Sequence, residues 1–151
     1  MLRYERTVKM ISSRKEIADT IRKHGFRATP QRVVIYEALW KASSHPSVSD
    51  IHEYAIKTDP SISLATVYKT LQLFSDIGLV REMGPRDGSI HYDPDTRFHI
   101  NLVCNKCGRV EDFDPGSIEG IIPDLDEEVG FHVQSINFEV RGLCSRCRSQ
   151  E

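Results

Sequence analysis

Apolar residues recur at helical spacing in four stretches of the front half of the chain. Each stretch follows a residue that commonly begins a helix, and these residues are, in order, Ser13, Thr29 with Pro30, Ser47 and Ser63. Gly25 ends the first stretch and Gly78 the last, as glycine often does after a helix. The pattern therefore predicts four helices before residue 79.

After Gly78 the pattern changes to short strand-like segments. Leu79–Met83 and Ser89–Tyr92 are strand candidates, and the turn-rich segment 84–88 between them is typical of a hairpin tip. Helices followed by a hairpin are the order of a winged helix-turn-helix, whose recognition helix would begin at Ser63. Residues 93–97 then indicate a hinge.

The rear half of the chain alternates strands with one helix. Strands are predicted at Ile100–Val103 and Arg109–Phe113, followed by a polar helix from Ser117 to Gly130. Residues 131–140 alternate well enough for a further strand. The expected fold class is α+β, with a winged helix-turn-helix before a small α/β unit.

All four cysteines lie in two Cys-x-x-Cys pairs, Cys104 with Cys107 and Cys144 with Cys147. Two such pairs supply four thiolates for one tetrahedral ion, and Zn²⁺ is the usual occupant. Two disulfides, an iron–sulfur cluster and two separate redox dithiols are the alternatives. Because four protein ligands leave no position for a substrate, the pattern indicates a structural zinc site.

Composition and charge favour a folded protein with a polyanion-binding front half. The chain has 151 residues, of which 28% are charged and 39% hydrophobic. Residues 1–86 have 14 Lys and Arg against 9 Asp and Glu, whereas residues 87–151 have 6 against 13. This asymmetry suggests a polyanion-binding module joined to a cation-binding module. The absence of a membrane-length apolar run and of a signal core near residue 1 leads us to expect a cytoplasmic protein.

The predicted recognition helix carries a small set of side chains suited to DNA. Its exposed N-terminal half is expected to present Ala65, Thr66, Tyr68 and Lys69 to the major groove. Hydroxyl groups can donate to base edges or contact thymine methyl groups, and a lysine can reach phosphate or guanine. Double-stranded DNA is therefore the expected partner.

Histidines and acids near the hinge form a second candidate metal set, which comprises His45, His91, Asp93, His99 and Asp112. Spacing by two places His91 with Asp93, and His99 with Asn101, on one face of a strand. Mixed imidazole and carboxylate ligands suit Fe²⁺, Mn²⁺ or Zn²⁺.

Several segments, taken in order, resemble the ferric uptake regulator (Fur) family: residues 25–32 (GFRATPQR), His45-Pro46, 65–68 (ATVY), 78–80 (GLV), 104–108 (CNKCG) and the closing pair Cys144/Cys147. The resemblance covers roughly residues 15–148. It implies a homodimeric, metal-responsive repressor with a winged-helix domain over 1–92, a hinge over 93–97 and a dimerisation and metal-binding domain over 98–151. It also implies that Arg27 contacts the minor groove of an A·T-rich, palindromic operator while Tyr68 and its neighbours read the major groove.

The same resemblance implies the regulatory ligands. His45, Asp93, His99 and Asp112 fall where Fur-family proteins, in particular the peroxide-sensing (PerR) branch, place them. Aspartate rather than glutamate at position 112 is similar to the peroxide sensors. The chain departs from the family at Asn101, where a histidine is expected, so Asn101 and His91 are further candidate ligands.

The expected function is thus a metal-dependent transcriptional repressor that responds to peroxide through Fe²⁺-catalysed oxidation of ligand histidines. One alternative is a regulator that reads iron or manganese abundance without sensing peroxide. Alternatives of another class are a zinc-dependent hydrolase, although no His-Glu-x-x-His stretch occurs, and a thiol oxidoreductase, although the βαβ pattern of thioredoxins is lacking.

Overall fold

The computed structural model describes residues 13–42, 45–86, 88–116, 125–133, 136 and 138–149. The chain divides between Thr96 and Arg97 into two compact units. We call the described residues before this point the helical unit and those after it the sheet unit. The division falls inside the segment 93–97 that the sequence suggests as a hinge.

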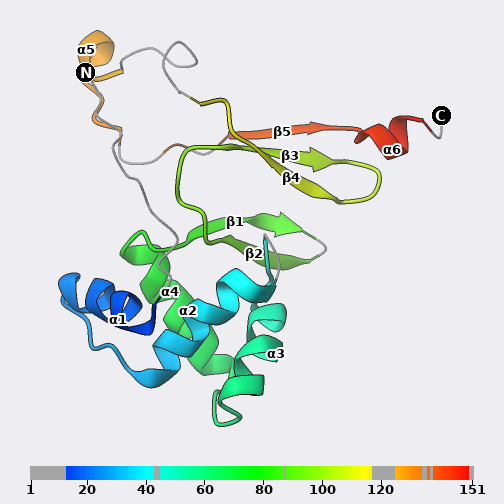
Figure 1. Cartoon of the computed structure of the whole chain (residues 1–151). Helices are drawn as coiled ribbons and strands as arrows, with labels where there is room; N and C mark the ends of the chain where they lie inside the picture. The colour runs from blue at the N-terminus through cyan, green and yellow to red at the C-terminus, as the bar shows by residue number, and fades with distance from the viewer. Residues whose placement is uncertain are drawn as a thin grey trace. The chain divides into compact units, whose positions relative to one another are not determined.

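Four helices build the helical unit, as the apolar stripes predict: α1 (Arg14–Lys23), α2 (Pro30–Ala42), α3 (Val48–Thr58) and α4 (Leu64–Asp76) (Figure 1). Their apolar faces meet in one core. Its largest fully buried side chains are Tyr36, Phe74, Ile21, Ile35, Leu39, Ile51, Leu71 and Val67. Burial of this apolar surface stabilises the unit and leaves the other helix faces for solvent or partners.

Predicted capping residues begin three of these helices. The Ser13 side chain and the Glu16 side chain satisfy each other's backbone N–H groups at α1, which is a capping box. Ser47 forms a second capping box, with Asp50, at α3. At α4 the Thr66 N–H donates to Ser63 Oγ at 3.1 Å. The cap at Ser63 matters for function because it fixes where the recognition helix begins.

Two antiparallel strands, β1 (Arg81–Arg86) and β2 (Ser89–Asp93), form the wing (Figure 1). The predicted strand start at Leu79 is wrong: Leu79 and Val80 are buried in the helical core and precede the pairing. The predicted hairpin tip is also too long, because pairing continues past Met83 through an irregularity in register. Leu79 and Val80 thus have a strand-like pattern in the sequence, although their side chains pack in the core of the helices.

The sheet unit has three strands in the order β4-β3-β5: β3 (Ile100–Cys104), β4 (Val110–Phe113) and β5 (Phe138–Gly142). β3 pairs antiparallel with β4 and parallel with β5. Two short helices complete the described part of the unit, α5 (Leu125–Val129) and α6 (Ser145–Arg148). None of the helices described in either unit is long and apolar enough to cross a bilayer.

Two predictions for this unit need correction. The described part of the predicted 117–130 helix is helical only over α5, and its predicted start at Ser117 lies outside the described residues. The strand predicted over 131–140 begins at Phe138, and residues 131–133 are not in a strand. The partner strand explains the shift, because β3 begins at Ile100 and Ile100 pairs with Phe138.

Candidate metal sites and DNA-reading helix

The four cysteines lie together at one end of the β3–β5 pair. β3 ends at Cys104, and the chain returns to β4 through a turn in which the Gly108 N–H donates to the Cys104 carbonyl at 2.9 Å. Gly108 has φ of 72°, a conformation that glycine adopts without strain. Cys144 begins helix α6, which contains Cys147. The backbone hydrogen bond from Asn105 to Gly142 (2.8 Å) joins the two cysteine-bearing ends.

Thiol geometry fits a tetrahedral Zn²⁺. The four Sγ atoms all lie within 4.8 Å of one another, and Cys107 Sγ is 3.8 Å from Cys144 Sγ. A Zn–S bond of about 2.3 Å in a tetrahedron requires S···S separations of about 3.8 Å. All four cysteines are free thiols, so the disulfide alternative does not describe this structure.

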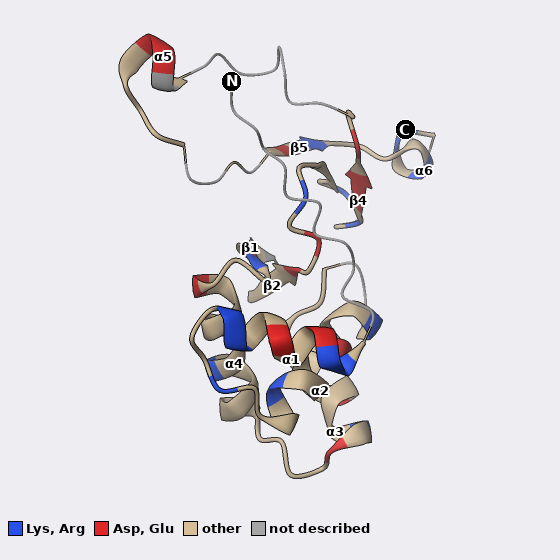
Figure 2. Ribbon diagram, turned by 60° about the vertical axis from the view of Figure 1, so that its left-hand side comes forward, with Lys and Arg blue, Asp and Glu red and all other residues tan. Residues whose placement is uncertain are grey.

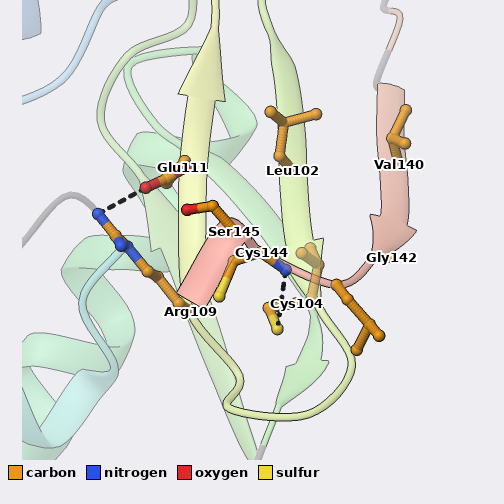
Figure 3. A pocket seen from close by; sticks show the side chains of 10 residues that line it. Leu102, Cys104, Arg109, Glu111, Val140, Gly142, Cys144 and Ser145 are labelled. Atoms are coloured by element: carbon orange, nitrogen blue, oxygen red, sulfur yellow. Dashed lines mark hydrogen bonds and ion pairs between the residues drawn. The ribbon is translucent and has the colours of Figure 1, made fainter. Parts of the chain in front are cut away.

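The local backbone favours the thiolate form of Cys104. Hydrogen bonds from the backbone of Cys144 and then Cys107 lower the pKa of Cys104 to about 6, and Figure 3 shows the first of them, from Cys144 N to Cys104 Sγ at 3.4 Å. Burial, followed by the neighbouring cysteines, raises the pKa of Cys147 to about 12. Zn²⁺ binds thiolates, so metal binding at this site is coupled to proton release.

A pocket of about 340 Å³ adjoins the cysteines on one face of the sheet (Figure 3). Its walls include Leu102 and Val140, which are paired across β3 and β5, and the Arg109–Glu111 ion pair at its edge. Because Cys104 and Cys144 also line it, the pocket forms part of the surroundings of the four-thiol site.

The helical unit brings together two of the predicted regulatory ligands. His45 follows α2, and Asp93 is the last residue of β2. Ligand atoms of the two side chains lie within 4.8 Å of each other, and the residues are 7% and 1% exposed. The Asp95 N–H donates to Asp93 Oδ1 at 2.8 Å, which helps to orient the carboxylate.

His91 has a different environment from the ligand pair. Its Nδ1 donates to the His45 carbonyl oxygen at 2.7 Å, so the ring faces the backbone of the predicted ligand. The Tyr92 N–H donates to the Pro46 carbonyl at 2.9 Å in the same region. Sequence spacing alone, which pairs His91 with Asp93, does not reveal this contact.

The sheet unit holds the other predicted ligands. His99 Nε2 is 3.9 Å from Asp112 Oδ1, and His99 Nδ1 donates to the Arg97 carbonyl at 2.9 Å. This hydrogen bond places a proton on Nδ1 and directs Nε2 towards Asp112, the ring orientation usual for a ligating histidine. Each unit therefore carries one histidine–carboxylate pair.

Asn101 lies directly opposite Asp112 in the β3–β4 register. The residue is fully buried, and neither its amide oxygen nor its amide nitrogen has a hydrogen-bond partner among the residues the structure describes. A buried, unsatisfied amide costs free energy, so its presence next to Asp112 is consistent with a site that takes up an ion.

Helix α4 presents the predicted DNA-reading residues. Ala65, Tyr68 and Lys69 are exposed, Thr66 is half-buried, and Val67 is buried in the core. Lys69 is the one basic residue of the helix. Figure 2 shows in blue how lysines and arginines are distributed over the helices of the helical unit. Leu64 has the helical spacing of the buried Val67, Leu71 and Phe74 but is 43% exposed, because it lies at the first helical position, before the first buried turn.

The exposed Arg27 lies in the segment between α1 and α2. Arg32, on the first turn of α2, donates from Nη1 to the Arg27 carbonyl at 2.6 Å. Arg32 was not among the residues predicted for the site. The only indication of Arg32 in the sequence was that it belongs to the GFRATPQR segment. Its hydrogen bond holds the backbone of Arg27, the residue predicted to contact the minor groove.

A capped reading helix with a wing, joined to a unit with a four-thiol metal site, defines a metal-binding transcription regulator. The sequence profile of the ferric uptake regulator family matches residues 23–141. The chain belongs to the ferric uptake regulator family.

Peroxide regulators are among the relatives. The chain is 33% identical over 136 residues to the peroxide-responsive repressor PerR of Staphylococcus epidermidis, covering 90% of this chain and 91% of that protein. It is 34% identical over 137 residues to the peroxide operon regulator of Bacillus subtilis, covering 91% and 94%. The crystal structure of the Campylobacter jejuni peroxide stress regulator matches with a TM-score of 0.68 and 32% identity, covering 85% and 97%.

Family membership confirms the coarser predictions. Proteins of this family are metal-responsive transcription regulators with an N-terminal winged helix-turn-helix and a C-terminal dimerisation domain, and they act as DNA-binding dimers. They are not enzymes, so the hydrolase and thiol oxidoreductase alternatives are set aside.

Proposed function

We propose that this protein is a metal-dependent repressor whose regulatory ion is held by His45, Asp93, His99 and Asp112. One observation carries the proposal: each unit contributes one histidine–carboxylate pair in its own fold. An ion shared by both pairs would fix the two units relative to each other. In a dimer this would hold the two α4 helices at a spacing that matches successive major grooves.

The DNA partner follows from α4 and its neighbours. Ala65, Thr66, Tyr68 and Lys69 would meet base edges and phosphates in the major groove. Arg27, held by Arg32, would enter the minor groove, where A·T-rich sequence narrows the groove and favours arginine. The proposed operator is accordingly A·T-rich, and palindromic to match a homodimer.

Zn²⁺ is the proposed occupant of the site formed by Cys104, Cys107, Cys144 and Cys147. These ligands come from the end of β3, the following turn and α6, so the ion would join the ends of β3 and β5. Its role in this account is to stabilise the sheet unit and, through it, the dimer.

Peroxide is the proposed signal when the regulatory ion is Fe²⁺. Bound Fe²⁺ would act as the catalyst that activates hydrogen peroxide, and the two electrons that reduce the peroxide would come from the imidazole ring. The ligand imidazole of His45 or His99 would gain one oxygen atom on a ring carbon while the other peroxide oxygen leaves as water. The oxidised ring binds metal less well, which would release the hinge and weaken DNA binding. The names of the relatives and Asp112 support this reading.

Peptide mass spectrometry tests peroxide sensing directly. Zinc-loaded protein carrying Fe²⁺ or Mn²⁺ is exposed to low peroxide, and added oxygen is mapped to residues. We expect oxygen on His45 or His99 in the Fe²⁺ sample alone, with His52, which donates to the Ile62 carbonyl, unmodified as the internal control. Unmodified His45 and His99 in protein shown to contain Fe²⁺ would contradict the peroxide step.

Asn101 favours a second candidate, a regulator that reads metal abundance. An amide oxygen is a weaker ligand for iron than imidazole and suits harder cations such as Mn²⁺. Because Asn101 is fully buried opposite Asp112, its oxygen has the place to contribute to such a site. Metal-dependent DNA binding without histidine oxidation would identify this second function.

A further inference from the structure

We infer that His91 is a positioning residue that anchors the His45 segment to β2, and not a ligand of the regulatory ion. The inference deepens the proposed function, since it assumes that His45 binds the ion. It concerns a single side chain on the wing whose contact joins residues 46 positions apart in the sequence.

Two links join residues 45–47 to β2. His91 Nδ1 donates to the His45 carbonyl at 2.7 Å, and the Tyr92 N–H donates to the Pro46 carbonyl at 2.9 Å as part of the backbone bridge between Ser47 and His91. Only the first link uses a side chain. The identity of residue 91 therefore decides whether the segment is held at its ligand-bearing end.

The hydrogen bond determines the state of the His91 ring. A carbonyl oxygen can only accept, so His91 must donate from Nδ1, and this nitrogen cannot bind a metal at the same time. His91 also lies outside the group of described ligand atoms within 4.8 Å of one another to which His45 and Asp93 belong, so its Nε2 does not share their site. The bond also fixes the plane of the ring against the backbone. By contrast, the proposed ligand His99 uses its Nδ1–H on the backbone of its own segment and directs Nε2 towards Asp112.

Asp50 secures the other side of the same segment. Its Oδ2 accepts from the Ser47 N–H at 2.8 Å and from Ser47 Oγ at 2.7 Å. These hydrogen bonds, with a smaller contribution from the charge of His91, lower the pKa of Asp50. Residues 45–47 are thus held between β2, through His91, and the first turn of α3, through Asp50.

This anchoring holds His45 close to Asp93, the other proposed ligand in the same unit. His91 and Asp93 are two residues apart on β2 and so share a face, and His45 and Asp93 come within 4.8 Å of each other. A ligand held in place before the ion arrives loses less conformational entropy on binding. His91 would therefore raise metal affinity without touching the metal.

The test compares His91→Ala and His91→Asn in the full-length, zinc-loaded protein. An asparagine amide can donate to the His45 carbonyl, so it conserves the anchor while removing the imidazole. His52→Ala is the matched control, because His52 also donates from its ring to a backbone carbonyl, that of Ile62, in the same unit. Thermal unfolding of each variant shows that it is folded.

Two readouts are measured: hydrogen exchange of the Tyr92 amide without regulatory metal, and Mn²⁺ affinity by titration calorimetry. We expect His91→Ala to speed Tyr92 exchange and to weaken Mn²⁺ binding roughly five- to tenfold, the effect of losing one hydrogen bond. His91→Asn should have a Tyr92 exchange rate and an Mn²⁺ affinity close to those of the natural protein. His52→Ala should change neither quantity.

Unchanged Tyr92 exchange in His91→Ala would overturn the inference. A second result would also overturn it: Tyr92 exchange is normal in His91→Asn, but Mn²⁺ binding in this variant is as weak as in His91→Ala. This is the result expected if His91 were a ligand of the ion. The proposed function fails separately, if His45→Ala binds Mn²⁺ as tightly as the natural protein. Tyr92 exchange still tests the anchor in that case, because it is read without the metal.

Discussion

Asn101 is the candidate ligand position at which the resemblance to the Fur family leads us to expect a histidine instead. It is buried opposite Asp112, in the sheet unit that also presents His99 Nε2 to that carboxylate. Imidazole binds Fe²⁺ and other transition ions more strongly than an amide oxygen does, whereas Mn²⁺ tolerates the oxygen ligand well. The side chain at position 101 should therefore set which metal the protein prefers.

We predict that Asn101→His raises the ratio of Fe²⁺ to Mn²⁺ affinity by about tenfold. Anaerobic competition titration with a chromophoric chelator measures both constants. Asn101→Ala is the control, since it removes the amide without adding imidazole and should not raise the ratio. Equal ratios in the natural protein and Asn101→His would show that position 101 lies outside the regulatory ion's coordination.

At the scale of helices and strands, the elements that depend on local sequence signals could be predicted. The apolar stripes predicted all four helices and the serines predicted where three of them begin, because cap and stripe lie in the same short segment. The limits of β1 and β5 were not predictable, because a strand ends where its partner does. The same holds for the His91–His45 and Arg32–Arg27 contacts, which depend on how the chain packs.

Helix α3 offers a test of how one cap supports the site. Hydrogen bonds from Ser47, first of all its side chain, lower the pKa of Asp50 in the folded protein. Its stabilising contribution is therefore complete above the unfolded-state pKa of about 3.9 and is lost as the pH falls through the lower folded-state value.

We predict that Asp50→Ala lowers the free energy of unfolding of the helical unit by about 1 kcal/mol at neutral pH. This difference should disappear at pH values below the folded-state pKa of Asp50. Urea unfolding at several pH values, followed by circular dichroism, measures it. Glu53→Ala, which removes an exposed acid of the same helix, is the control. A loss of stability that does not depend on pH would mean that Asp50 acts through packing.

At the scale of the whole molecule, two metals have separate tasks in this account. The four-thiol site lies wholly within the sheet unit, whereas the regulatory ligands are divided between the units. Zinc should therefore support the sheet unit and the dimer, and the second ion should govern DNA affinity. In the sequence, the charge asymmetry and the cysteine pairs indicated this division of tasks. They did not indicate which residues orient the ligands.

We predict that Cys144→Ser, which removes one thiolate, lowers zinc content and shifts the protein from dimer to monomer. Zinc analysis and sedimentation equilibrium measure the two effects. The helical unit should keep its fold, because its core is built from residues 17–92. Ser145→Ala, beside the site but outside the ligand set, should leave both properties unchanged. A stable dimer without zinc would contradict a structural role for the ion.

The central claim is that the regulatory ion controls DNA binding, and one measurement tests it most directly. Duplexes are selected from a random-sequence pool with zinc-loaded, Mn²⁺-loaded protein, and their affinity is measured by fluorescence anisotropy at fixed salt. We predict that a chelator which removes Mn²⁺ but leaves zinc weakens binding by roughly tenfold or more, and that His45→Ala binds weakly with or without Mn²⁺. Equal affinity of the natural protein in both conditions would contradict the claim.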